Sequence, residues 1–261
     1  MNKIDPTAII HPTCQLGDNI IIGPYAVIGE NVQIGDNTEI MHHAVIEKDT
    51  KIGKNNKIHT SAVLGGDPQD IGYHGEKTFL EIGDNNQIRE FVTIHRGSRE
   101  GNITKVGNDN FLMAYVHVGH DCIIHNNVIL TAFVGISGHC VVEDYAIIGG
   151  LAGLHQFVRV GTMAMIGGVS KVNIDIPPFT LCDGNPVKVR STSSIGLNRR
   201  GKSKAVISAL SDSVKIIFHS QLNRRTAISQ VKEKYPNIEE VTYLTDFLEA
   251  GRQGNNGRQL N

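Results

Sequence analysis

An aliphatic residue recurs at every sixth position through the first two thirds of the chain. Counting in steps of six from Ile4 to Val172, 26 of 29 positions carry Ile, Leu or Val, and the exceptions are Asp70, Glu76 and Glu100. Neither the helical period of about 3.6 residues nor the alternation of a simple strand produces this spacing. The pattern therefore predicts a protein built from hexapeptide repeats.

The other positions of each hexapeptide indicate how it folds. Glycine often follows the aliphatic residue, and the fourth residue after it is small or β-branched, as at Ala8, Ala26 and Ala44. One large and one small inward side chain, followed by a turn rich in Gly, Asp and Asn, describe a short strand and a tight turn. Three such units close a triangular coil of about 18 residues, and successive coils stack in parallel. We therefore predict a mainly β protein, with a parallel β-helix of about nine or ten coils over residues 1–190.

Two stretches interrupt the repeat. The segments that follow Leu64 and Ile94 are polar and contain glycine, so they cannot fill the interior of a prism. They are predicted to form loops at about 66–79 and 96–105 that project from the corners of the coils. Loops on a rigid solenoid are where such proteins commonly place their binding or catalytic residues.

The pattern changes after Val172. From about residue 191, apolar residues recur with the spacing of a helix, which predicts a C-terminal α-helical domain over 191–261. The start of this region is basic, and its cations include Arg199, Arg200 and Lys202. A basic helical face is either solvated or the docking site of an acidic partner.

Composition is typical of a cytoplasmic protein without a membrane span. Lys and Arg number 25 against 26 Asp and Glu, so no overall charge draws the chain to nucleic acid or to a membrane. No apolar run approaches the ~20 residues of a transmembrane helix, and we expect no signal peptide before the first repeat. Cys14, Cys122 and Cys140 fall on the small inward position, where cysteine is expected to pack rather than to form disulfides.

Residues three hexapeptides apart should lie in one column on successive coils. His120, Gly138 and Gln156 share one column, and Asp121 and His139 share the next. Because Gly138 has no side chain, it is predicted to open a gap of roughly 10 Å in its column, with a backbone N–H near the floor. A histidine beside a carboxylate and facing such a gap is the arrangement expected of a general base. Further imidazoles of this part of the sequence are those of His95, His117, His125 and His155.

Five segments extend this local pattern. They are REFVTIHRG at 89–97, HVGHDC at 117–122, AIIGGLAGLHQF at 146–157, DIPPF at 175–179 and GLNRRG at 196–201. Together with the hexapeptide repeat they resemble the UDP-N-acetylglucosamine O-acyltransferases, which transfer an acyl chain from acyl carrier protein in the first step of lipid A biosynthesis. The resemblance covers essentially the whole chain, and it implies that the prism is left-handed.

The resemblance also implies a role for each candidate residue. His120 would remove the proton from the sugar 3-hydroxyl as this oxygen attacks the acyl thioester, Asp121 would hold His120, and the N–H of Gly138 would stabilise the oxyanion. Gly168 would set the acyl length, and its lack of a side chain favours a long 3-hydroxyacyl chain. No metal or cofactor is implied, because the phosphopantetheine thioester of acyl carrier protein already has a good leaving group. The positions that would bind substrate are Asp70, His95, His117, His139, His155, Gln156 and Arg199.

The same resemblance implies an assembly and a protein partner. The family is homotrimeric, with active sites between neighbouring prisms, and three-sided prisms with exposed faces favour such an assembly. The basic start of the helical domain would then bind the acidic acyl carrier protein.

Two departures from the family bear on substrate binding. A lysine is common two residues after the loop aspartate, whereas this chain has Gly72, so one phosphate or donor contact is missing or is supplied by a neighbouring residue. Ser193 and Ile195 replace an Asn and a Glu, which leaves open whether the acceptor is a 3-hydroxyl or a 3-amino sugar.

Three other functions share parts of the pattern. The N-acyltransferase that acts later in the same pathway has the prism, the donor and a histidine base, but it usually carries an N-terminal uridine-binding domain. The γ-class carbonic anhydrases bind zinc with three histidines on the same kind of prism, and the spacing of His120 and His125 resembles part of that site. A scaffold without catalysis would leave the HDC segment unexplained.

Overall fold

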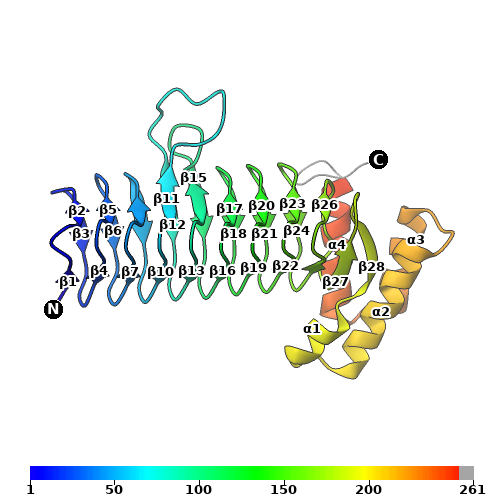
Figure 1. Cartoon of the computed structure of the whole chain (residues 1–261). Helices are drawn as coiled ribbons and strands as arrows, with labels where there is room; N and C mark the ends of the chain where they lie inside the picture. The colour runs from blue at the N-terminus through cyan, green and yellow to red at the C-terminus, as the bar shows by residue number, and fades with distance from the viewer. Residues whose placement is uncertain (253–261) are drawn as a thin grey trace.

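The structure, a computed structural model, describes residues 1–252, and its main feature is a triangular prism of short strands. Three sheets form the three faces of a left-handed parallel β-helix, whose coils stack along one axis (Figure 1). The amino terminus lies at one end of this axis, and the helices lie at the other. The predicted fold class is confirmed.

Each sheet takes one short strand from nearly every coil. Sheet A contains β1 (Lys3–Ile4), β4 (Ile21–Ile22), β7 (Glu39–Ile40), β10 (Lys57–Ile58), β13 (Gln87–Ile88), β16 (Phe111–Leu112), β19 (Ile129–Leu130), β22 (Ile147–Ile148), β25 (Met165–Ile166), β27 (Thr180–Asp183) and β28 (Lys188–Thr192). Sheet B contains β2 (Ile9–Ile10), β5 (Val27–Ile28), β8 (Val45–Ile46), β11 (Val63–Gly66), β14 (Thr93–His95), β17 (His117–Val118), β20 (Gly135–Ile136), β23 (Gly153–Leu154) and β26 (Lys171–Val172). Sheet C contains β3 (Gln15–Leu16), β6 (Gln33–Ile34), β9 (Thr50–Ile52), β12 (Phe79–Ile82), β15 (Ile103–Val106), β18 (Ile123–Ile124), β21 (Val141–Val142) and β24 (Arg159–Val160).

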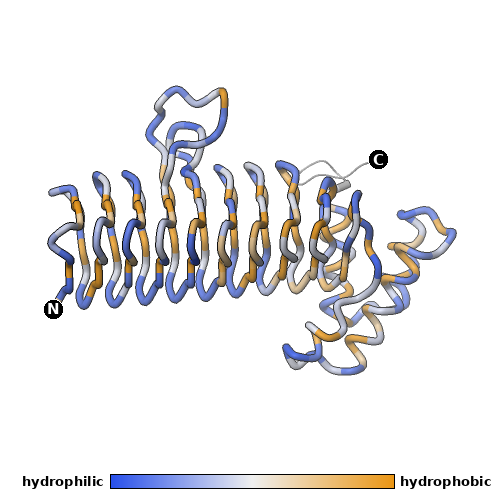
Figure 2. The backbone as a smooth tube through the Cα atoms, viewed as in Figure 1, coloured by the Kyte–Doolittle hydropathy of each residue, from blue (hydrophilic) through white to orange (hydrophobic). Residues whose placement is uncertain are grey.

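The hexapeptide repeat explains both the strands and the corners. The recurring aliphatic residue is the last residue of most strands and points inward, so that Ile40, Ile58 and Leu130 are fully buried. Figure 2 shows these apolar positions recurring along the whole prism. The third residue after the aliphatic lies in the left-handed region at most corners, as at Asn55 with a φ of 56° and Asp121 with a φ of 59°. Asn and Asp adopt this conformation more readily than most residues.

The two interruptions are insertions at one corner. Strands β11 and β14 pair with a separation of 30 residues and β12 and β15 with one of 24, whereas ordinary coils repeat at 18. The extra residues amount to whole hexapeptides, so the phase of the aliphatic positions survives both insertions. They form the loops 67–78 and 96–102, which project from the corner between sheets B and C (Figure 1).

Beyond the hexapeptide period the chain closes the end of the prism. The period ends at Val172, yet β27 continues sheet A in parallel with β25, and β28 turns back antiparallel to β27. The sequence pattern missed these two strands because they lack the six-residue spacing. Within residues 1–252 four helices follow, which are α1 (Ser194–Arg199), α2 (Lys204–His219), α3 (Arg224–Lys234) and α4 (Glu239–Arg252).

The helices pack on one another and on the end of the prism. Helix α2 buries Leu210 and Val214 in an apolar cluster that includes Phe179. Arg159 of β24 donates to the carbonyl of Phe247 in α4 at 3.1 Å, which ties the helical region to the last coils. None of the described helices is long and apolar enough to cross a membrane.

Candidate active site

His120 and Asp121 lie at the corner between sheets B and C, in the turn from β17 to β18. The loops 96–102 and 67–78 leave the prism at this same corner, one and two coils closer to the amino terminus. Residues that are distant in the sequence therefore meet along one edge of the prism.

A short hydrogen bond joins the predicted base to its carboxylate. Nδ1 of His120 donates to Oδ2 of Asp121 at 2.7 Å, and the two side chains are only 12% and 7% exposed. Nε2 of His139 lies 3.7 Å from the same oxygen, and its ring meets the His120 ring edge to face. Because Nδ1 of His120 is bonded to the carboxylate, Nε2 is the nitrogen that can accept a proton.

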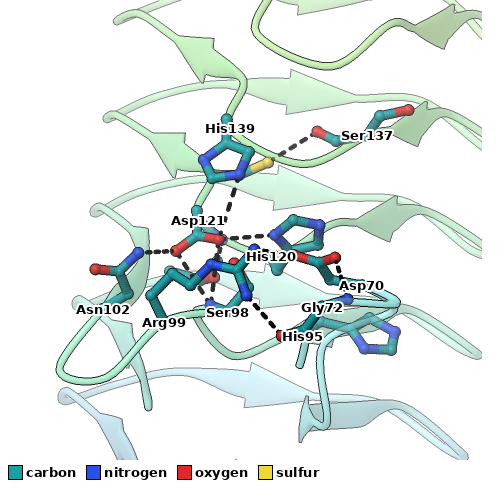
Figure 3. A network of polar contacts seen from close by, with 12 residues as sticks. Asp70, Gly72, His95, Ser98, Arg99, Asn102, His120, Asp121, Ser137 and His139 are labelled. Carbon is teal, nitrogen blue, oxygen red and sulfur yellow. Dashed lines mark hydrogen bonds and ion pairs between the residues drawn. The ribbon is translucent and has the colours of Figure 1, made fainter. Parts of the chain in front are cut away.

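Loop 96–102 fixes the Asp121 carboxylate from the other side (Figure 3). The backbone N–H of Ser98 donates to both carboxylate oxygens at 3.2 Å, and Nδ2 of Asn102 donates to Oδ1 at 2.8 Å. The N–H of Asp121 in turn donates to the Thr104 hydroxyl at 2.8 Å. Burial alone would raise the pKa of Asp121, but its hydrogen bonds outweigh burial and hold the pKa below the ordinary value. The carboxylate is therefore charged and oriented at neutral pH.

Two more of the predicted histidines lie beside this pair. Nδ1 of His117 shares a hydrogen bond of 2.9 Å with the hydroxyl of Thr93, and the rings of His117 and His95 meet edge to face at 5.2 Å. Nδ1 of His95 donates to the carbonyl of Asp67 in loop 67–78. Burial, together with the neighbouring imidazoles, holds the pKa of His117 below its ordinary value. The His117 ring is therefore neutral at neutral pH, with one nitrogen free for a ligand.

Gly138 lies under the ring of His120. A Cβ built on this glycine would stand 2.6 Å from both Cε1 and Nε2 of His120, which is too close for any side chain. The prediction of an open gap in this column is therefore wrong, because the imidazole itself fills the space that the glycine leaves. Gly138 is buried, and no hydrogen bond among the described residues uses its N–H. An unpaired buried N–H is uncommon, and it is available to a ligand.

Asp70 of loop 67–78 lies close to the same pair. Its Oδ1 accepts the N–H of Gly72 at 2.9 Å, and its Oδ2 lies 3.6 Å from Nη2 of Arg99. The Gly72 N–H, and less strongly the charges of Arg99 and His120, hold the pKa of Asp70 below its ordinary value. The first inserted loop thus adds a second carboxylate to this corner.

Two predicted residues lie further along the corner, and one lies at another. His155 and Gln156 stand two coils beyond His120, and both are exposed. Gly168 follows β25 at the corner between sheets A and B, so it lies at the opposite edge of sheet B.

Arg199 is further away, in the last turn of α1. Its neighbour Arg200 places its guanidinium 4.1 Å from the ring centre of Tyr145, at the corner between sheets C and A. Within one chain, His120, Gly168 and the α1 arginines therefore belong to three different corners of the prism.

Sequence reasoning missed four residues of loop 96–102 that build the corner. They are Arg96, Ser98, Arg99 and Asn102. Arg96 is 1% exposed and donates to the Gly65 carbonyl, the Asp67 carboxylate and, at 3.4 Å, the Tyr73 hydroxyl, so it joins the two inserted loops. The signal available in the sequence is the polar run HRGSREGN directly before the repeat resumes.

A metal site is the alternative use of this corner. His120, Asp121 and His139 each offer a ligand atom, and over residues 1–252 these are the three that lie within 4.8 Å of one another. The direct hydrogen bond of 2.7 Å between two of these atoms is the geometry of a base and its carboxylate rather than of two ligands on one ion. His125, which the carbonic anhydrase reading requires, lies at the corner between sheets C and A.

The fold and the corner together define a class of protein. Residues 31–66 and 103–138 match the family described as bacterial transferase hexapeptide (six repeats). Residues 175–256 match the family described as UDP N-acetylglucosamine O-acyltransferase, domain 2. A left-handed prism of hexapeptide repeats that carries a His–Asp pair on one corner is therefore placed among the hexapeptide acyltransferases.

Comparison with individual proteins narrows this class to one family. The chain is 57% identical over 255 residues to the acyl carrier protein-dependent UDP-N-acetylglucosamine O-acyltransferase of Chlorobium phaeobacteroides, with 97% of each chain covered. It is 53% identical to the protein of the same name from a Sulfurihydrogenibium species, over 97% of this chain and 94% of the relative. The crystal structure of the UDP-N-acetylglucosamine acyltransferase from Bacteroides fragilis matches with a TM-score of 0.93 and 40% identity, over 99% of each chain. The chain belongs to the UDP-N-acetylglucosamine O-acyltransferase family, as its sequence segments predicted.

Proposed function

We propose that this protein transfers a 3-hydroxyacyl chain from acyl carrier protein to the 3-hydroxyl of UDP-N-acetylglucosamine, the first step of lipid A biosynthesis. The observation that carries the proposal is the His120–Asp121 pair, with its carboxylate fixed by loop 96–102. Relatives that carry the name of this activity match the chain over nearly their whole length. Family membership favours this reaction over the later N-acyltransferase, a γ-class carbonic anhydrase or a scaffold.

In the proposed reaction, Nε2 of His120 removes the proton from the 3-hydroxyl while the hydroxyl oxygen attacks the thioester carbon. Asp121 stabilises the imidazolium that forms, through the hydrogen bond at Nδ1. The charge that develops on the former carbonyl oxygen accepts the free N–H of Gly138. When the C–S bond breaks, the departing phosphopantetheine sulfur takes the proton from His120, which restores the neutral base and releases a thiol.

The other polar residues of the corner are proposed to hold the nucleotide sugar. They are Asp70, His95, His117, His139, His155 and Gln156. Four of these lie around the His120–Asp121 pair, whereas His155 and Gln156 lie two coils further on and extend the surface along the axis.

A homotrimer is the proposed assembly. His120, Gly168 and Arg199 belong to three corners of one prism, and packing prisms face to face brings different corners together. In such a trimer Gly168 would line the acyl groove, and its lack of a side chain favours a long 3-hydroxyacyl chain. The basic region around Arg199 would bind the acidic acyl carrier protein. The trimer and the cytoplasmic location stay predictions.

The test is the transfer itself. Purified protein is incubated with labelled UDP-N-acetylglucosamine and a panel of 3-hydroxyacyl carrier proteins, beside His120→Ala and, as a matched control at another corner, His125→Ala. We expect transfer by the wild type and the control, and a loss of about 10²- to 10⁴-fold in His120→Ala. Absence of transfer from every donor by a folded, trimeric wild type would contradict the proposal.

A 3-amino UDP-sugar is the second acceptor to include in this assay. Ile195 is 72% exposed and offers no polar group at a position where the resemblance led us to expect a glutamate. The same base serves an amine acceptor, which loses its proton as the C–N bond forms. Transfer to the amino sugar alone would replace the hydroxyl acceptor in the proposal.

A further inference from the structure

Gly72 stands where the resemblance to the family led us to expect a lysine, and the structure shows which group fills that space. A Cβ built on Gly72 would lie 2.9 Å from both Nη1 and Nη2 of Arg99. The guanidinium of Arg99, which comes from the second inserted loop, therefore occupies the place of a side chain on the first. A cation is present beside position 72 although residue 72 has none of its own.

Two contacts hold this guanidinium. Nη1 of Arg99 donates to the carbonyl of Gly72 at 2.6 Å, and Nη2 lies 3.6 Å from Oδ2 of Asp70. The side chain of Arg99 nevertheless remains 57% exposed. A guanidinium has more N–H donors than these two contacts use, so part of its planar fork is open to a ligand.

Arg99 lies at the edge of the candidate active site. It contacts Asp70, whose carboxylate is close enough to His120 for the two charges to interact, and Figure 3 shows all three at the same corner. Arg96, the other arginine of this loop, is 1% exposed and bonds to groups of loop 67–78. Arg99 is therefore the arginine of this loop that a substrate can reach.

We propose that Arg99 binds a phosphate group of a substrate. This inference rests on the proposed function, because both proposed substrates carry phosphate. The diphosphate of the nucleotide sugar and the phosphodiester of the phosphopantetheine arm present the same kind of oxygen pair to a guanidinium fork. The loop arginine then supplies the cationic contact that Gly72 cannot make.

The first experiment compares ligands that differ only in phosphate. Arg99→Gln keeps an amide that can donate to the Gly72 carbonyl, but it removes the charge. Calorimetry measures the binding of UDP and of uridine, and the transfer assay measures KM for acylated phosphopantetheine and for acylated pantetheine. We expect Arg99→Gln to weaken one phosphate-bearing ligand about tenfold or more and to leave its phosphate-free counterpart unchanged. A loss for UDP assigns the diphosphate, and a loss for acylated phosphopantetheine assigns the phosphodiester.

The second experiment moves the cation from one loop to the other. In Gly72→Lys with Arg99→Ala, the new side chain no longer meets the guanidinium, and residue 72 does not have the left-handed backbone that would strain it. We expect this double variant to recover most of the affinity that Arg99→Ala loses. Lys105→Ala removes a cation of similar exposure from β15, directly after the loop, and should change neither ligand.

The inference is overturned if Arg99→Gln, with an unchanged melting temperature, binds every phosphate-bearing ligand as tightly as the wild type. A folded double variant that recovers none of the loss would also overturn it. A wild type that transfers no acyl chain would instead contradict the proposed function, and the comparison of UDP with uridine would still report on Arg99. The two failures are therefore distinguishable.

Discussion

Two corners of the prism use the same backbone turn for different purposes. At the corner between sheets C and A, side chains in the left-handed position form a ladder of amide hydrogen bonds of 3.1 to 3.2 Å. The members of this ladder are Asn19, Asn37, Asn55 and Asn85. At the corner between sheets B and C, the same position carries Asp121 and His139, with φ values of 59° and 60°.

The difference lies in where the partners of these side chains come from. In the ladder, each amide donates to the next copy of itself, so repetition alone satisfies the polar groups. Asp121 has no such copy on the preceding coil, because loop 96–102 replaces the ordinary turn there and supplies Ser98 and Asn102. An insertion of one whole hexapeptide thus turns a structural position into a chemical one without disturbing the core.

The largest effect that separates the two corners is expected at Asp121. Asp121→Asn keeps the shape of the side chain but removes the charge that holds Nδ1–H of His120 and stabilises its protonated form. We expect kcat to fall about 10²-fold or more with little change in KM. Steady-state kinetics check this, and Asn55→Ala, the matched change in the ladder, should leave kcat unchanged. Equal losses of kcat in both variants would remove the distinction between the corners.

A smaller loss is expected from Asn102, which reaches Asp121 from the loop. Asn102→Ala removes the donor to Oδ1 at 2.8 Å, while the bonds from Ser98 and His120 remain. We expect kcat to fall about tenfold and the pKa of Asp121 to rise toward its ordinary value. Kinetics measure the first effect, and an NMR titration of the carboxyl carbon measures the second. Kinetics equal to those of the wild type would mean that the Ser98 backbone alone orients the carboxylate.

The prism could be predicted from the sequence because its interior obeys one strict period. Both insertions consist of whole hexapeptides, so Gly138 falls under His120 as the spacing required. The separation of Gly168 from His120 is not a whole number of coils, so the sequence also held the signal that these residues belong to different corners.

The contacts of the inserted loops could not be predicted in this way. Arg96 and Arg99 bond to groups of the other loop, and Asn102 bonds to the next coil, so no period relates donor to acceptor. The strands β27 and β28 escaped prediction for the same reason, since they are placed by pairing at the end of sheet A rather than by a repeat.

A pH-dependent effect on stability is expected at His117. Burial holds its pKa below the value of about 6.5 for an unfolded histidine. Between the folded pKa and about pH 6.5 the unfolded chain binds the proton and the folded chain does not, so stability is lost as the pH falls through this window. His117→Gln should therefore lose less stability than the wild type between about pH 7.5 and about pH 5.5. Denaturant unfolding at several pH values measures this, and parallel curves for the two proteins would assign the titration to other groups.

The smallest effect is expected in the amide ladder. Asn37 accepts from Asn19 and donates to Asn55, both at 3.2 Å, and its φ of 57° favours Asn over Ala. Asn37→Ala should lower the free energy of unfolding by on the order of 1 kcal/mol and leave kcat unchanged. Asn37→Gly loses the same two hydrogen bonds without strain at the turn, so the difference between the variants measures the turn and the remainder measures the ladder. A loss of kcat in either variant would show that the core transmits a change from one corner to another, and the two corners would no longer be independent.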